Sequence, residues 1–131
     1  MTIKEKTIEI QKKLLRNGIE KHNLESEMIM SLALNKDRLF LITNSYKKIK
    51  EKENKKINRI VSQRLELYPL AYISGKRNFY DLEFNVNKNT LIPRPESELI
   101  IEEIVKKERQ SKNNKTFIDI GTGSGCLIIS L

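Results

Sequence analysis

Apolar residues in the first part of the chain recur every three or four positions, the spacing that gathers side chains on one face of a helix. This pattern predicts an amphipathic helix over residues 2–17, ended by Gly18. A second helix is predicted to begin near Asn23 or Ser26, either of which can cap it. The first apolar stripe is Ile3, Thr7 or Ile8, Ile10, Leu14 and Leu15, and the second is Met28, Ile29, Leu32, Ala33 and Leu34.

Two further helices are predicted before residue 69. Asn35-Lys-Asp37 interrupts the second stripe, and Asp37 is placed to cap a short third helix through residue 42. Residues 46–68 follow as a long, strongly charged helix with apolar positions at Ile49, Ile57, Ile60, Val61, Leu65 and Leu67. Four such helices can bury one small core, so residues 1–68 are predicted to form an α-helical N-terminal domain. A core of this size contributes only about a few kcal/mol of net stability.

The pattern changes at residue 69, where short extended segments replace the helical stripes. All three prolines of the chain fall here, at Pro69, Pro93 and Pro95. Two or three short strands are predicted among residues 78–80, 82–86 and 90–92, joined by turns at Asp81 and at residues 87–89. Because each proline also biases the residue before it towards extended backbone, residues 69–95 are predicted to be a β-hairpin linker.

One more helix follows the hairpin. Glu96 and Glu98 place carboxylates in its first turn, where the helix dipole favours them, and the helix is expected to run to about Gln110. Its predicted apolar stripe is Leu99, Ile100, Ile104 and Val105. Residues 111–115 then form a polar loop.

A short β-type segment, residues 117–120, leads directly into Gly121, Gly123 and Gly125. Three of the five glycines of the chain lie in this turn, which calls for a local steric reason. Glycine permits positive φ and a close approach of the backbone, and a strand–turn–helix leaves unpaired N–H groups facing a ligand.

The spacing Asp-x-Gly-x-Gly-x-Gly limits the classes of ligand that this turn can bind. A dinucleotide fingerprint starting at Gly121 requires glycine where the chain has Cys126, and the Gly-Lys-Ser/Thr of a phosphate-binding P-loop is missing. The remaining candidate is the pattern that holds the methionine end of S-adenosylmethionine.

The charge of the chain adds a second hypothesis. Lys and Arg number 25 against 17 Asp and Glu, a net charge of +8, which is compatible with nucleic acid as a partner. The excess is mostly lysine interleaved with Glu and Asn, including the run at residues 47–56, without an arginine-rich or aromatic-studded stripe. We therefore favour solvated helix faces and expect no dedicated nucleic-acid site.

The remaining chemistry-bearing residues point to structural roles. Cys126 is the single cysteine, so no internal disulfide forms, and it is expected to be a small core residue in a reducing cytoplasm. His22 is the single histidine and is expected to be a solvated loop residue, so no metal site is predicted. The sequence has neither the h-region of a signal peptide nor a membrane-span pattern, and we expect a monomer without a membrane partner.

Four blocks of sequence together carry a family resemblance: Pro69-Leu-Ala-Tyr-Ile-Ser-Gly75, Phe79-Tyr80, Leu91-Ile-Pro-Arg-Pro-Glu-Ser-Glu98 and Asp119-Ile-Gly-Thr-Gly-Ser-Gly-Cys126. With them the chain resembles the HemK family of S-adenosylmethionine-dependent methyltransferases, which modify the glutamine of the Gly-Gly-Gln motif in peptide chain release factors. The segments Glu27–Leu34 and Arg38–Leu41 are similar to the N-terminal domain signature of that family, with much less specificity.

The resemblance implies a fold and a set of site residues. The fold is an α-helical N-terminal domain that binds the release factor, a β-hairpin linker, and the start of an α/β Rossmann-like methyltransferase domain at residues 96–131. The cofactor-binding residues implied are Asp119, Gly121, Thr122, Gly123, Ser124 and Gly125, with Arg94, Pro95 and Glu96 over the pocket. Simpler roles stay open: Asp119 caps the turn, Arg94 to Glu96 only begin a helix, and Phe79 and Tyr80 only pack the hairpin.

The sequence also departs from the family pattern. It has no Asn-Pro-Pro-Tyr loop, which holds the substrate amide in the family, and no acidic residue about twenty positions after the glycines for the cofactor ribose. We therefore expect a truncated methyltransferase without catalytic residues, inactive alone and with weak or no cofactor binding. Its residues 112–131 are expected to be poorly ordered, misfolded or covered by a partner. The alternatives are a non-catalytic release-factor-binding module and the product of a broken reading frame. Asp81 replaces a common glycine, but aspartate tolerates a left-handed turn, so the hairpin should survive.

Overall fold

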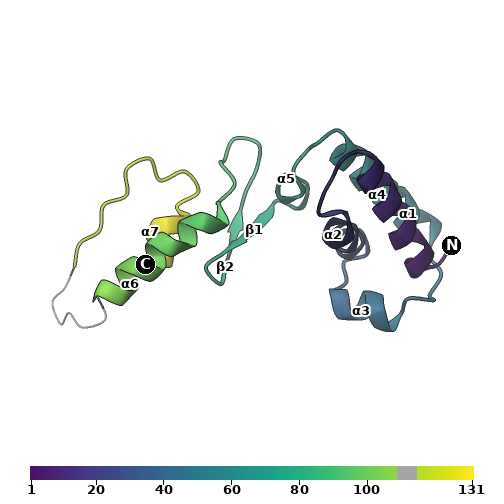
Figure 1. Cartoon of the computed structure of the whole chain (residues 1–131), viewed down its shortest axis with the longest axis horizontal. Coiled ribbons are helices and arrows are strands. Elements are labelled where there is room, and N and C mark those ends of the chain that lie inside the picture. Colours follow the sequence, from purple (N-terminus) through teal and green to yellow (C-terminus); the bar gives the residue numbers. More distant parts are fainter. Residues whose placement is uncertain (109–114) are drawn as a thin grey trace. The chain divides into compact units, whose positions relative to one another are not determined.

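Two compact units, Met1–Ile73 and Ser74–Leu131, make up the protein in this computed structural model, which describes residues 1–108 and 115–131 (Figure 1). The helices that begin in the first unit are α1 Ile3–Arg16, α2 His22–Leu34, α3 Arg38–Thr43, α4 Glu51–Leu65 and α5 Leu70–Ser74. The second unit contains β1 Lys76–Phe79, β2 Leu82–Asn85, the 3₁₀ turn η1 Pro95–Ser97, α6 Glu98–Glu108 and α7 Cys126–Ser130. The fold is thus mostly helical with a two-stranded antiparallel sheet, which is consistent with the predicted helical domain and confirms a hairpin, although residues 70–74 of the predicted hairpin linker form α5 instead.

Helix α1 begins at a complete capping box. The Glu5 N–H donates to the Thr2 hydroxyl (3.3 Å), and the Thr2 N–H donates to the Glu5 carboxylate (2.7 Å), which lowers the pKa of Glu5. The helix ends before Gly18, as predicted, and this glycine has a φ of +74°. Ile8 and Leu15, which the sequence pattern placed in the core, are instead 40% and 56% exposed, because the helical period turns them away from the face that buries Ile3, Ile10 and Leu14.

Helix α2 starts earlier than predicted. It begins at His22 with Lys21 at the cap position and no side-chain cap, so the prediction of Asn23 or Ser26 as the cap is wrong. After the turn at Gly18, Ile19 is buried, and α2 begins three residues later at His22. Consequently His22 is a half-buried helical residue rather than a loop residue. Within the helix Met30 is fully buried, whereas Met28 is 47% exposed and does not belong to the core.

The connection from α3 to α4 combines a confirmed prediction with a correction. Asp37 caps α3 by accepting a hydrogen bond from the Phe40 N–H (2.7 Å), as expected. Helix α4, however, begins at Glu51 and not at Tyr46, because residues 44–47 form a turn and Lys48 makes an isolated antiparallel bridge to Thr2 at the N-terminus. There the Ile3 N–H donates to the Lys47 carbonyl (3.0 Å), and the Ile49 N–H donates to the Met1 carbonyl (3.1 Å).

The core of the first unit lies where α1 and α4 pack against α2. Its fully buried members are Ile10, Leu14, Ile29, Met30 and Ile57. Two polar contacts also join these helices. The buried Lys6 ammonium donates to Asn58 Oδ1 (2.8 Å) and to Glu9 Oε2 (3.0 Å), and Arg64 makes two hydrogen bonds to the Glu25 carboxylate (2.6 and 3.1 Å). Each buried charge therefore has a partner, as buried charges require.

The hairpin of the second unit turns at two left-handed residues. Tyr80 and Asp81 have φ values of +46° and +61°, the signs that a two-residue type I′ turn requires. The expectation that the hairpin tolerates Asp81 is confirmed. Of the two alternatives, two strands or three, the structure has two: the Thr90 N–H donates to the Asn87 carbonyl (2.9 Å), which makes a turn, and residues 90–92 pair with neither strand.

Helix α6 and the hairpin share a small second core of Phe79, Phe84 and Ile101. The rings of Phe79 and Phe84 meet edge to face at 6.3 Å. Ile101 was not in the predicted stripe but is fully buried, whereas Leu99 and Ile100 are 61% and 49% exposed. The predicted helix end near Gln110 and most of the predicted loop 111–115 lie outside the described residues.

The predicted strand at residues 117–120 is wrong, because these residues are irregular. A strand requires a hydrogen-bonded neighbour, and the described residues contain no strand beyond the hairpin pair. Ile118 and Ile120 are accordingly 85% and 93% exposed, so they lack the covering elements that a Rossmann-like sheet would provide. Poor order in residues 112–131 stays a prediction, and residues 112–114 lie outside the described chain.

Two adjacent leucines of α1 test where the first core lies. Leu14 is fully buried and Leu15 is 56% exposed. We expect Leu14→Ala to lower the free energy of unfolding by about 2–5 kcal/mol, because it leaves a cavity in the core. Leu15→Ala should change it by no more than about 0.5 kcal/mol. Urea titration followed by far-ultraviolet circular dichroism measures both, and equal losses would contradict the assigned core.

Candidate functional site

The glycine loop, residues 119–125, has a defined backbone shape. Gly121, Gly123 and Gly125 have φ values of +79°, +56° and +77°, so all three are left-handed. The Thr122 hydroxyl donates to Oδ2 of Asp119 (2.9 Å), and the Gly125 N–H donates to the Thr122 carbonyl (2.8 Å). Asp119 therefore braces the loop from its first residue, as predicted for a capping acid.

The C-terminal end of the glycine loop is anchored in the second core. Gly125 is buried and precedes α7, where Cys126 and Leu127 pack against the cluster of Phe79, Phe84 and Ile101. This is the small packing role predicted for Cys126. Gly125 has a φ of +77°, so the backbone conformation favours glycine there, and a Cβ added at this position would lie 3.0 Å from Cδ1 of Ile129, which would have to shift slightly.

The other side of the loop is open. Gly121, Thr122 and Gly123 are exposed, and a Cβ added at Gly121 would meet no atom within 4 Å. Asp119 is half-buried, and a carboxylate that accepts one hydrogen bond retains acceptor capacity for an ammonium group. A braced carboxylate beside an exposed left-handed turn fits the amino-acid end of S-adenosylmethionine. Ser124, also implied by the resemblance, is half-buried in the same loop.

Arg94, Pro95 and Glu96 lie at the start of η1. Arg94 is the N-cap residue, its carbonyl accepts from the Ser97 N–H (3.0 Å), and Pro95 occupies the first position, where a missing N–H costs nothing. All three side chains are exposed. Their observed role is to begin the helix, the simpler alternative from the sequence, and a role over the donor pocket stays a prediction.

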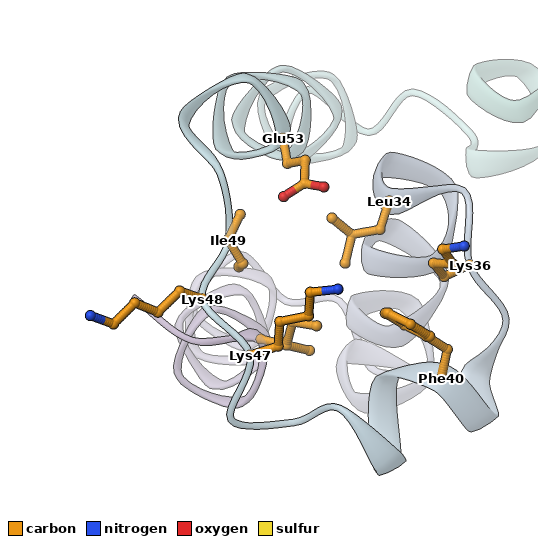
Figure 2. A pocket seen from close by; sticks show the side chains of 8 residues that line it. Leu34, Lys36, Phe40, Lys47, Lys48, Ile49 and Glu53 are labelled. Atoms are coloured by element: carbon orange, nitrogen blue, oxygen red, sulfur yellow. The ribbon is translucent and has the colours of Figure 1, made fainter.

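The first unit, Met1–Ile73, called the helical unit from here on, contains a small pocket that the sequence did not predict (Figure 2). Its volume is about 60 Å³, and it is lined by Ile3, Leu34, Lys36, Phe40, Lys47, Lys48, Ile49 and Glu53. Lys36 and Lys47 each place the ammonium nitrogen 5.3 Å from the centre of the Phe40 ring. In Figure 2 the side chains of Lys47, Leu34 and Glu53 point towards the centre of the pocket, whereas Lys48 points away.

The pocket depends on the turn and bridge at residues 44–49, which replace the predicted start of α4. The bridge between Thr2 and Lys48 holds Lys47 and Ile49 beside α3. Glu53 is fixed from α4, because its Oε2 accepts from the Lys50 N–H (2.7 Å). The lysine-rich run and Phe40 were visible in the sequence, but nothing local indicated that Lys47 and Phe40 would meet.

Within residues 1–108 and 115–131, no group of three or more His, Cys, Asp or Glu side chains is arranged to hold a metal ion. In the same described ranges no helix combines the length and the apolar character needed to cross a bilayer.

Comparison with known proteins finds one matching family and several similar relatives. Residues 7–75 match the family described as the PrmC N-terminal domain. The chain is 34% identical to a protein of Clostridium botulinum named release factor glutamine methyltransferase. The 131 aligned residues cover 100% of this chain and 46% of that protein. A protein of the same name from Mycoplasma mycoides is 39% identical over 118 residues, which cover 90% of this chain and 42% of the relative. A bifunctional methyltransferase of Rickettsia bellii is 31% identical over 144 residues, which cover 91% and 26%. The chain thus spans about half the length, or less, of these curated relatives.

Gly125→Ala tests the anchored end of the glycine loop. A left-handed alanine costs about 1–2 kcal/mol, and its Cβ also crowds Ile129, so α7 should open more often. We expect the Ile129 amide, which donates to the Gly125 carbonyl (3.0 Å), to exchange its hydrogen about tenfold faster in this variant. Ser124→Ala is the control, because Ser124 is not left-handed. Identical exchange in the two variants would show that the glycine is not required.

Proposed function

Because the chain belongs to the PrmC N-terminal domain family of release factor glutamine methyltransferases, we propose that it contributes two parts of such an enzyme. The helical unit binds the peptide chain release factor. The glycine loop forms part of the site for S-adenosylmethionine. The reaction of the whole protein would be methylation of the glutamine in the Gly-Gly-Gln motif of the release factor.

The glycine loop is the observation that carries the methyltransferase part of the proposal. Three left-handed glycines and the hydrogen bond from Thr122 to Asp119 form an open turn beside a fixed carboxylate. Asp119 would accept hydrogen bonds from the amino group of the donor, while Gly121 and Gly123 let the backbone approach it closely. S-adenosylmethionine, when bound, supplies an electrophilic methyl group on a sulfonium.

Orientation of the substrate amide would provide most of the acceleration of methyl transfer. An amide nitrogen is a weak nucleophile because its lone pair is delocalised into the carbonyl, so it must be held in line with the methyl group. By resemblance this task falls to an Asn-Pro-Pro-Tyr loop, and no segment of these 131 residues has that sequence. We therefore assign binding roles to this chain and assign no residue to the methyl-transfer step.

The charge distribution supports the assignment of substrate binding to the helical unit. Residues 1–73 hold 16 of the 25 Lys and Arg residues but only 9 of the 17 Asp and Glu residues. The rest of the chain holds 9 basic and 8 acidic residues, so nearly all of the net charge of +8 belongs to the first unit. Charge of one sign attracts a partner of the opposite sign and accelerates association.

A second candidate function is a release-factor-binding module that does not catalyse. The favouring observation is the core of residues 1–73, which contains eleven buried side chains and does not require the second unit for its members. The two candidates differ in whether the glycine loop is used.

Binding and methyl transfer by this chain test the proposal. We expect the 131 residues to bind a purified bacterial release factor, with affinity that falls as salt rises because the helical unit is basic. We expect no transfer of labelled methyl from S-adenosylmethionine to the release factor, because the chain lacks the orienting loop. Isothermal titration and a filter assay measure the two, with a full-length relative as positive control. Absence of binding would contradict the proposed role of the helical unit, and methyl transfer would contradict the division of roles.

A further inference from the structure

We propose that a surface built on α3 binds an acidic side chain of a protein partner in the small pocket of the helical unit that Phe40 lines, here called the Phe40 pocket. This α3 surface consists of Leu39, Ile42 and Tyr46 together with the pocket residues Lys36, Phe40 and Lys47. The inference rests on the proposed function, since the partner would be the release factor, and it assigns the contact to one face of the helical unit.

Charge at the pocket is the first argument. The ammonium groups of Lys36 and Lys47 both lie 5.3 Å from the centre of one phenyl ring, so they lie within twice that distance of each other. The negative face of an aromatic ring attracts each cation, but the two cations still repel one another. Glu53 is the acidic residue that lines the pocket, and one of its oxygens already accepts from the Lys50 N–H. An added carboxylate would relieve this repulsion and make charge-assisted hydrogen bonds.

The size of the pocket limits the occupant to a small group. At about 60 Å³ the cavity is far below the roughly 300–1,000 Å³ of sites for cofactors and other small molecules. Its walls include the apolar side chains of Ile3, Leu34 and Ile49, which would contact the methylene stem of an aspartate or glutamate. A single acidic side chain matches both the volume and the mixed lining.

Exposed apolar residues on α3 and in the turn that follows it favour a protein over a nucleic acid. Leu39, Ile42 and Tyr46 are 67%, 63% and 78% exposed. Leu39 and Ile42 are three positions apart in α3 and so lie on one side of it. Exposed apolar side chains on the same element as a basic pocket are typical of protein interfaces, whereas a phosphate backbone would leave these side chains in water.

Lysine substitutions in the full chain test the inference. Lys36→Gln and Lys47→Gln each should weaken binding to a purified release factor about 3- to 10-fold and reduce its salt dependence, as expected for contacts at the centre of an interface. Leu39→Ser should weaken it about as much without lowering the melting temperature, because Leu39 is exposed. The control is Lys12→Gln, an exposed lysine of α1 outside the surface, which should bind within about twofold of the unchanged chain.

The outcomes separate the inference from the proposed function. Weakening in the α3-surface variants with an unaffected Lys12→Gln supports the inference. If all variants bind the release factor as the unchanged chain does, the α3 surface is not the contact and the proposed function stands. If the unchanged chain fails to bind, both fall. A single-stranded RNA of fifteen nucleotides that binds through Lys36 and Lys47 and displaces the release factor would overturn the assignment to an acidic protein segment.

Discussion

Mutual burial of the apolar stripes of α1, α2 and α4 is the constraint on which the helical unit depends. Ile10, Leu14, Ile29 and Ile57 are removed from water only if the three helices pack together. Helix α3 contributes one buried residue, Leu41, to this core. The same packing that stabilises three helices therefore leaves most of the fourth free to contact another molecule.

The glycine loop does not depend on a shared core along its whole length, because only its C-terminal end is packed and its other end is exposed. Cys126 and Leu127 attach α7 to the hairpin core, while Ile118 and Ile120 remain in water. Hydrogen bonds within the loop, from Thr122 to Asp119 and from Gly125 to Thr122, hold its shape without help from a sheet. The conformation of the glycine loop is thus encoded locally, in the glycines and one acid, without neighbouring strands in the described residues.

Features set by a few neighbouring residues were predictable from the sequence. Asp37 caps α3 and Asp81 accepts a left-handed turn because both depend on short-range chemistry. The turn and bridge at residues 44–49 were not predictable, since this segment forms hydrogen bonds with the N-terminus more than forty positions away. Its charged residues suited a helix equally well. The Phe40 pocket was missed for the same reason, and Ile101 was missed because apolar residues at 99–101 leave the buried face ambiguous.

Amide hydrogen exchange of the full chain, with and without a purified release factor, tests most directly the claim that the helical unit holds the protein substrate. We predict slower exchange of the amide hydrogens in α3 and residues 44–50 when the release factor is present, and unchanged exchange in residues 117–125. Slower exchange confined to residues 117–125, with α3 unaffected, would contradict it.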